Sequence, residues 1–275
     1  HNEARAAMDK ALQARVRLAA KHADEAWPLA ATWRLRATLR AALGDNEVAA
    51  ESLVQARALA ETLCLRAGGA EAADRFLQQT LIDQADHALR TGDLNRAREA
   101  ADAARIRAEA LAQAQPSALW FSEASAAWDR LGEVARAAQA SAPTQDAFAR
   151  AVAFRRLALQ CEQDDAAHRR ALASALVKLG EIALDTENPQ SARAAFHESA
   201  SIRLQLLDEA PDSRRAHYAL ASVLERLGLA AFACGDRAAA CGAWEEQLVL
   251  AARIFPDHDA PDGMRFRAIV HAHLA

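Results

Sequence analysis

Several side chains in this sequence are of types that could catalyse a reaction or hold a metal ion, so their spacing decides what they can do. His197 is followed by Glu198 in a stretch that reads as helix, but the next four residues contain no second histidine, as a helical zinc site would require. His271 and His273 are two residues apart and would diverge on a helix. The sequence also has no phosphate-binding glycine loop, no GxSxG elbow and no CxxC pair. We therefore predict no catalytic residues, no metal ion, no cofactor and no enzymatic activity.

Two carboxylate pairs have simpler explanations than general acid–base chemistry. Asp164 and Asp165 stand at the start of a predicted helix, where anionic side chains complement the helix macrodipole. Glu245 and Glu246 are expected on a solvated helix face.

The four cysteines are not spaced as a metal site or a disulfide framework. They lie among alanines and leucines, which predicts small buried thiols in a reducing compartment. Cys234 and Cys241 flank one predicted turn and are the one pair that could meet.

Composition excludes several classes of function. The chain has 275 residues, 52% of them hydrophobic, and a formal net charge of −4, so no basic field is available to attract nucleic acid or an anionic membrane. No apolar run approaches the roughly 20 residues that span a bilayer. We expect a cytoplasmic protein with no nucleic-acid and no membrane partner. Because the chain opens at His1, we also expect a fragment of a larger protein.

The organisation of the chain follows from a recurring small residue within predicted helices. Gly132, Gly180 and Gly228 are evenly spaced (180 − 132 = 48 and 228 − 180 = 48), and Ala85 and Ala37 continue the series toward the amino terminus. A mid-helix glycine costs about 1 kcal/mol relative to alanine, which favours a close helix crossing at that point. Sixteen residues after each small residue stand Leu53, Ala101, Phe148, Phe196 and Trp244. A small residue is therefore expected to face a large one in every unit except the second.

Turn signals divide each unit into two helices. LGDN, TGDL, SAPT, NPQ and CGDR occur at 43–46, 91–94, 141–144, 188–190 and 234–237, where glycine can end one helix and a polar residue can cap the next. We predict a single all-α domain over 1–275, a superhelical solenoid of antiparallel hairpins with a unit of about 48 residues. It comprises a preceding helix at 1–22, five hairpins at 23–258 and a C-terminal capping helix at 259–275. The predicted helices are 3–21, 24–43, 46–66, 70–90, 93–113, 117–139, 144–161, 165–185, 190–208, 212–233, 237–254 and 261–274.

This pattern resembles the tetratricopeptide repeat (TPR) family. The family signature of Trp, Leu and Gly followed by Ala and Phe is matched by Trp128, Leu131, Gly132 and Phe148, and less fully by Leu227, Gly228, Ala240 and Trp244. The aromatic residue expected three positions after the glycine is replaced by alanine, and the unit is longer than the family's 34 residues. The segment 196–228 is similar to long-unit repeats of bacterial multidomain signalling proteins. The resemblance implies a module that binds proteins or peptides.

Mapped onto the first helix of each hairpin, the family's concave groove gives a candidate binding site. Acidic residues dominate it in the last three units, which favours a protein or peptide partner with a basic segment. The alternative is a solvated surface whose acids pair with neighbouring arginines. The candidate groove consists of Asp129, Glu133, Arg136, Val177, Glu181, Asp185, Glu225, Leu229 and Phe232.

Three functions remain open from the sequence. The first is a regulatory segment of a larger bacterial signalling or defence protein, which binds a partner in the groove and acts on an effector domain in the same or a partner chain. The second is a structural scaffold or oligomerisation module that uses its ends. The third is a small-molecule sensor with its ligand near Trp128 and Phe232.

Overall fold

The computed structural model describes residues 2–67, 70–255 and 261–274, and this part of the chain contains helices and no strand. The all-α hairpin repeat predicted from the sequence is confirmed. A 3₁₀ turn, η1 (Ala23–Glu25), precedes the second α-helix. The α-helices are α1 (Asn2–Ala19), α2 (Ala26–Ala42), α3 (Asn46–Ala67), α4 (Glu71–Thr91), α5 (Leu94–Ala114), α6 (Ala118–Ala137), α7 (Ser141–Cys161), α8 (Ala166–Asp185), α9 (Pro189–Glu209), α10 (Arg214–Ala233), α11 (Arg237–Ile254) and α12 (Pro261–Leu274).

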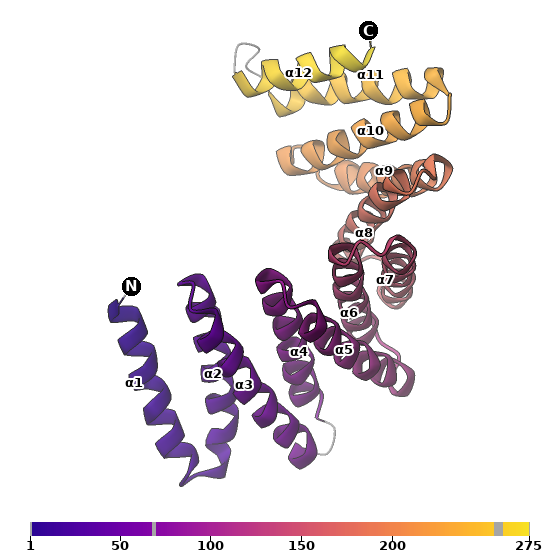
Figure 1. The fold of residues 1–275 in the computed structure, drawn as a ribbon. Helices are drawn as coiled ribbons and strands as arrows, with labels where there is room; N and C mark the ends of the chain where they lie inside the picture. The colour runs from indigo at the N-terminus through magenta and orange to yellow at the C-terminus, as the bar shows by residue number, and fades with distance from the viewer. Residues whose placement is uncertain (1, 68–69, 256–260, 275) are drawn as a thin grey trace. The chain divides into compact units, whose positions relative to one another are not determined.

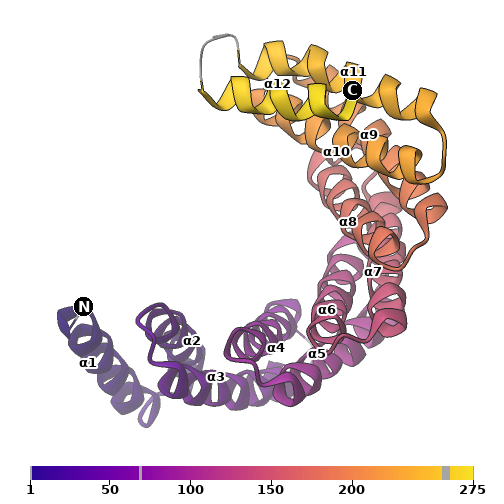
Figure 2. The ribbon, with the colours of Figure 1, turned by 45° about the horizontal axis from the view of Figure 1, so that its top comes forward.

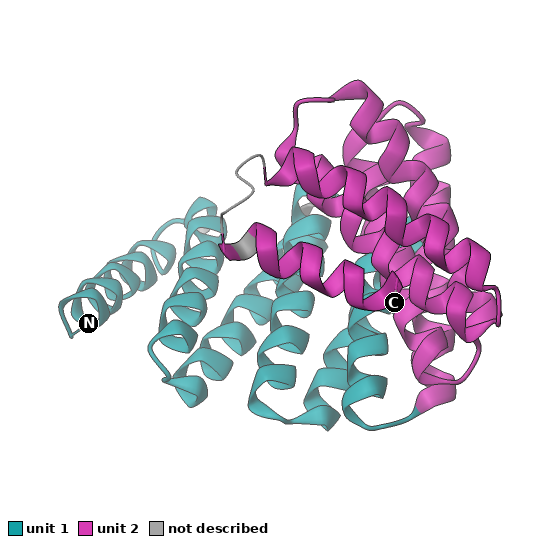
Figure 3. Cartoon of the chain, turned by 90° about the horizontal axis from the view of Figure 1, so that it is seen from above, with its two compact units in different colours: residues 1–116, 126–140 teal, residues 117–125, 141–275 magenta. Residues whose placement is uncertain are grey.

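The chain divides into two compact units (Figure 3), residues 1–116 with 126–140 and residues 117–125 with 141–275. In unit 1, each helix from α1 to α5 packs against the next one along the chain. In unit 2, the helices from α7 to α12 do the same (Figures 1 and 2). Each unit is therefore a stack of helical hairpins, in which one hairpin covers the apolar face of the next.

The recurring small residues mark close contacts between the two helices of a hairpin. A Cβ placed on Gly180 would lie 2.6 Å from Cε1 of Phe196, and one on Gly228 would lie 2.5 Å from Cε2 of Trp244. Both distances are shorter than any ordinary carbon–carbon contact, so these helices approach as closely as they do because the residue is glycine. In the second hairpin Ala85 and Ala101 share one core cluster, the small-on-small exception that the sequence predicts.

The turn inside each hairpin contains one residue with a left-handed backbone. Gly44, Gly92 and Gly235 have φ of 81°, 79° and 80°. Gln139 and Glu187 hold the corresponding position in the third and fourth hairpins, each with φ of 56°. Successive members of this series are 48, 47, 48 and 48 residues apart (92 − 44, 139 − 92, 187 − 139 and 235 − 187). Only glycine adopts this conformation without steric cost, so two of the five turns are strained.

The SAPT prediction was wrong in detail. Residues 141–144 already belong to α7, which begins at Ser141, because proline is tolerated in the first turn of a helix and Gln139 makes the preceding turn. The other boundaries agree to within a few residues. The NPQ prediction is confirmed, since Oδ1 of Asn188 accepts a 3.2 Å hydrogen bond from the Ser191 amide and Pro189 opens α9.

The first and last helices each pack against the neighbouring helix of their own unit. α1 packs on α2, where Asp9 accepts a 2.9 Å hydrogen bond from Nε of Arg36. α12 packs on α11 with Val270 buried in a cluster that includes Trp244. The capping role of the helix predicted at 259–275 stays a prediction, and its residues 259, 260 and 275 lie outside the described part. Among the described helices, none has the length and apolar character needed to cross a bilayer.

Candidate functional site

Ion pairs recur between the first helices of successive hairpins. Arg226 of α10 donates a 2.6 Å hydrogen bond to Glu181 of α8, and Arg130 of α6 donates a 3.1 Å hydrogen bond to Asp86 of α4. In both pairs the acid follows the central small residue by one position, and the arginine precedes the next small residue by two. These acids are therefore partly neutralised within the repeat, as the alternative explanation in the sequence analysis anticipated for neighbouring arginines.

Three residues of the candidate groove precede the small residue of their unit by three positions. Asp129 is buried, and Val177 packs against the core cluster formed by α8, α9 and α10. Glu225 is half-buried, and its backbone carbonyl accepts a 3.3 Å hydrogen bond from Nε1 of Trp244. This position thus lies against the helix stack rather than fully in solvent.

The remaining groove residues are more accessible. Glu133 and Arg136 pair with each other on α6 in unit 1. In unit 2, Asp185 is exposed at the end of α8, while Leu229 and Phe232 of α10 are 40% and 54% exposed. Because α6 residues 129–136 belong to the other unit, their convergence with these unit 2 residues stays a prediction.

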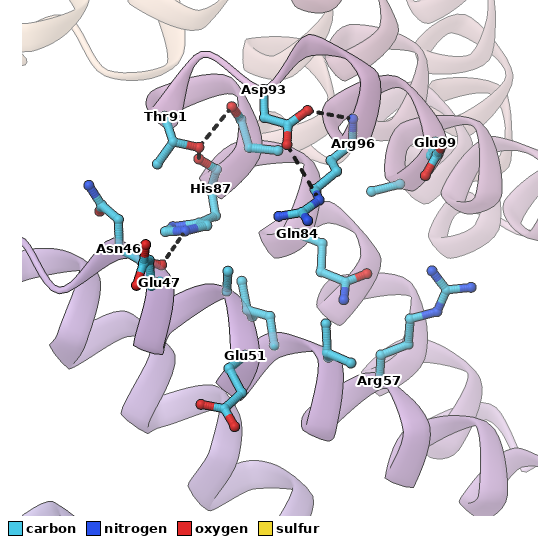
Figure 4. A pocket seen from close by; sticks show the side chains of 15 residues that line it. Asn46, Glu47, Glu51, Arg57, Gln84, His87, Thr91, Asp93, Arg96 and Glu99 are labelled. Carbon is cyan, nitrogen blue, oxygen red and sulfur yellow. Dashed lines mark hydrogen bonds and ion pairs between the residues drawn. The ribbon is translucent and has the colours of Figure 1, made fainter.

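Unit 1 contains a pocket of about 720 Å³ that the sequence analysis missed (Figure 4). It lies between α3 and α5, with His87, Ala88 and Gln84 of α4 also lining it. Its charged lining side chains are four acids and two arginines, Glu47, Glu51, Asp93, Glu99, Arg57 and Arg96. Asn46 and Asp93 of the lining belong to the turn signals at 43–46 and 91–94, but the 48-residue spacing of these signals is what places them in neighbouring hairpins.

His87 is the buried polar side chain of this pocket. Its Nε2 lies 3.0 Å from the backbone carbonyl of Asn46, which joins α4 to the start of α3 (Figure 4). A carbonyl only accepts, so Nε2 carries the proton. Burial, together with the positive charge of Arg90, lowers the pKa of His87 below its ordinary value of 6.5 and outweighs the opposing effect of the Asn46 hydrogen bond. The imidazole is therefore a neutral link between two helices.

One group of potential metal ligands occurs among the described residues. Oxygen and nitrogen atoms of Glu162, Asp165 and His168 lie within 4.8 Å of one another. Asp165, however, caps α8, since its carboxylate accepts hydrogen bonds from the amides of Ala167 and His168, and these bonds lower its pKa. This confirms the helix-start explanation given for the Asp164–Asp165 pair.

The cysteines and the remaining flagged side chains have structural surroundings. All four cysteines are free, and the prediction that they are buried was wrong: Cys161, in the last turn of α7, is exposed, and Cys64, Cys234 and Cys241 are partly exposed. Glu245 and Glu246 are exposed as expected. His273 stacks on Trp244 with ring centroids 4.9 Å apart. Trp128 donates a 2.8 Å hydrogen bond to Glu109 and lies under the guanidinium of Arg105.

Comparison with known proteins identifies the fold. No protein-family model and no curated protein matches the chain. The crystal structure of BtubC (BKLC) from P. vanneervenii matches with a TM-score of 0.66 and 17% identity, over 94% of this chain and 93% of that one. The MamA protein gives a TM-score of 0.46 with 16% identity over 84% and 95%. TTC0263, a thermophilic TPR protein of Thermus thermophilus, gives 0.38 with 15% identity over 89% and 98%. The match to BtubC over nearly the whole of both chains shows that this chain shares its fold, a helical repeat of the TPR-like kind that the sequence predicts.

Proposed function

We propose that this chain is a non-catalytic protein-interaction module that binds a partner segment on the surface shared by α8 and α10. This α8–α10 surface consists of Glu181, Asp185, Glu225, Arg226, Leu229 and Phe232. The observation that carries the proposal is the exposure of an aromatic and an aliphatic side chain beside acidic residues on consecutive first helices.

The two helices present these residues in register. α8 and α10 each open a hairpin and therefore run in the same direction, and the 2.6 Å contact between Glu181 and Arg226 fixes their alignment. One helical turn further along each helix come Asp185 and Leu229, followed by Phe232. An acidic position and an apolar position are thus expected side by side.

Leu229 and Phe232 can supply the affinity. Burying an exposed side chain of this size contributes about 1.5–3 kcal/mol, and aromatic anchors concentrate the binding energy of protein interfaces. The centres of the Phe232 and Trp244 rings lie 6.4 Å apart, so the exposed phenylalanine packs against a buried tryptophan. A partner that covers both side chains gains a preformed apolar contact.

The charge of the surface indicates the chemistry of the partner. Three carboxylates, Glu181, Asp185 and Glu225, accompany one guanidinium, Arg226, so the net charge is −3 + 1 = −2. Such a surface favours a basic segment and raises its association rate at low salt. The finer proposal that binding regulates an effector domain of a signalling or defence protein rests on the family resemblance.

The test is quantitative affinity capture from native lysate with the wild type and two variants. Leu229→Ala/Phe232→Ala removes the apolar anchor, and Val249→Ala removes a 71% exposed apolar side chain from α11 as a matched control. We expect a captured protein that the double variant loses and the control retains, and whose recovery falls as salt is raised. Identical protein lists from all three baits would refute the assignment to this surface.

Small-molecule sensing is a second candidate, and the unit 1 pocket favours it. Its volume of about 720 Å³ lies in the range of ligand pockets. A metabolite library screened by thermal shift tests it, with Ala50→Trp as the variant that fills the pocket. A ligand that stabilises the wild type but not the variant supports sensing; equal stabilisation of both rejects it.

A further inference from the structure

A further pocket in unit 2 lies near the amino-terminal end of α10, away from the end that carries Leu229 and Phe232. It has a volume of about 850 Å³ and is lined by residues of α9, α10 and α12 and by residues at the end of α11. The described residues that line it are arginines and apolar or aromatic residues. The residues are Arg203, Arg214, Arg215, Tyr218, Ala219, Ile254, Phe255, Arg265, Phe266 and Ile269.

The four arginines of this pocket lack carboxylate neighbours in it. The described lining residues include no acid, and within the described part of the chain none of the four arginines forms an ion pair. Arg203 donates to the hydroxyl of Ser199 at 3.3 Å, and the guanidinium of Arg214 lies over the Phe255 ring, 5.6 Å from its centre. The pocket therefore holds several positive charges that none of the described carboxylates neutralises.

The surroundings of Arg203 are electrostatically unfavourable for its positive charge. It is half-buried, and burial together with the nearby charge of Arg226 lowers its pKa. Arg226 is neutralised by Glu181, whereas Arg203 has a hydroxyl for its partner. A bound anion would relieve this unfavourable electrostatics.

The position of Arg214 and Arg215 also favours an anionic ligand. They are the first two residues of α10, whose N-cap is Ser213. Positive side chains at a helix amino terminus oppose the macrodipole, which favours anions there. An anion bound in this pocket would interact favourably with both arginines and with the helix end.

The aromatic side chains form a connected wall. The Phe266 ring of α12 lies 5.7 Å from Phe255 and 6.5 Å from Tyr218 of α10, measured between ring centres. Tyr218 and Ile269 are largely exposed, so the apolar lining continues to the rim of the pocket. The site is thus suited to a ligand that has acidic groups and apolar side chains and extends beyond the pocket.

We propose that this arginine pocket binds an acidic segment of a partner protein, with the carboxylates on the arginines and an apolar side chain against Tyr218, Phe255 and Phe266. Guanidinium groups pair with carboxylates through two parallel hydrogen bonds. The pocket is distinct from the α8–α10 surface, because Arg214, Arg215 and Tyr218 lie in the first two turns of α10 and Leu229 and Phe232 lie in its last two.

The experiment is fluorescence anisotropy with a labelled, end-blocked peptide, EEFEELEE, and the full chain. The comparison peptides are QQFQQLQQ, without charge, and EEGEEGEE, without apolar side chains. The test variant is Arg214→Gln/Arg215→Gln. The control is Arg170→Gln/Arg237→Gln, which removes two exposed arginines near the amino-terminal ends of α8 and α11 and changes the net charge equally. Circular dichroism verifies that both fold.

We expect EEFEELEE to bind with a Kd of about 100 µM or tighter, and the test variant to weaken it at least about tenfold while the control does not. Both comparison peptides should bind much more weakly, and added salt should release EEFEELEE. Equal binding by both double variants would refute the proposal. Preference of the wild type for ATP or for phosphatidylserine vesicles over the peptide would also overturn it, in favour of a phosphate ligand or a membrane. Loss of binding here leaves capture through Phe232 unaffected, so the two proposals fail separately.

Discussion

Replacing Gly228 by alanine should destabilise unit 2, although alanine is ordinarily the better helix former. At an open helix position the change gains about 1 kcal/mol. At Gly228 the new Cβ would lie 2.5 Å from Cε2 and 2.7 Å from Cδ1 of Trp244, where carbon atoms prefer about 3.5–4.0 Å. Trp244 is 3% exposed and its ring contacts Phe232 and His273, so it has little room to move. Overpacking of this kind costs up to about 3 kcal/mol, which leaves a net loss of about 2 kcal/mol.

The assay is thermal unfolding followed by far-ultraviolet circular dichroism, with two matched glycine variants. Gly242 lies within α11 and an added Cβ there would meet no atom within 4 Å, so Gly242→Ala should raise the midpoint. Gly180→Ala should lower it, because its Cβ would meet Phe196. Repeat arrays do not always unfold in one step, so the order of the midpoints is the readout.

One result would refute this reasoning. If Gly228→Ala raised the midpoint as much as Gly242→Ala, helix contact would not be the reason for the glycine. A double variant, Gly228→Ala with Trp244→Leu, checks the same point, since removal of the indole should remove most of the penalty of the alanine.

Three further predictions concern the turns, a cap and the buried histidine. Glu187→Gly should stabilise the protein by up to about 1 kcal/mol, because glycine relieves a left-handed residue; Glu187→Ala serves as the control, and an equal gain from it in denaturant unfolding would contradict the explanation. Asn188→Ala should cost about 1 kcal/mol through loss of the α9 cap, and Asn188→Asp should recover most of it. Since the pKa of His87 is lowered in the folded state, its stabilising effect is complete above pH 6.5 and is lost as pH falls below that value toward the folded pKa; the midpoint of His87→Leu should fall less than that of the wild type over this interval, and parallel curves would count against a neutral buried imidazole.

The repeat frame was predictable because it rests on short-range geometry. A small residue and a large one sixteen positions later lie on the two helices of one hairpin, and the contacts at Gly180 and Gly228 confirm this pattern. The left-handed residues at Gln139 and Glu187 were not predictable by residue type, because neither is glycine. Their spacing from Gly92 and Gly235 was the available signal.

The candidate binding surfaces were harder to predict, because their residues come from different hairpins. Glu181 and Arg226 are 45 positions apart in the sequence (226 − 181 = 45), so their pairing depends on how two hairpins stack. Arg203 of α9 and Arg265 of α12 are likewise distant in sequence, yet both line the arginine pocket of unit 2. The feature of the sequence that could have indicated this pocket is the pair of consecutive arginines, Arg214 and Arg215, at the start of a predicted helix.

The regular interval between the left-handed turns also bears on how such a chain can change in length. Glu187 and Gly235 occupy the same place in consecutive hairpins, and Phe196 and Trp244 meet equivalent glycines. Removing residues 181–228 would join Gly180 directly to Leu229 and bring Trp244 into the register that Phe196 now holds. Whole units can therefore be lost or duplicated while neighbouring contacts keep their local partners, whereas a deletion that is not a whole number of units shifts the residues that meet at the helix crossing. The crossing glycine thereby sets the step by which this protein can grow or shrink in evolution.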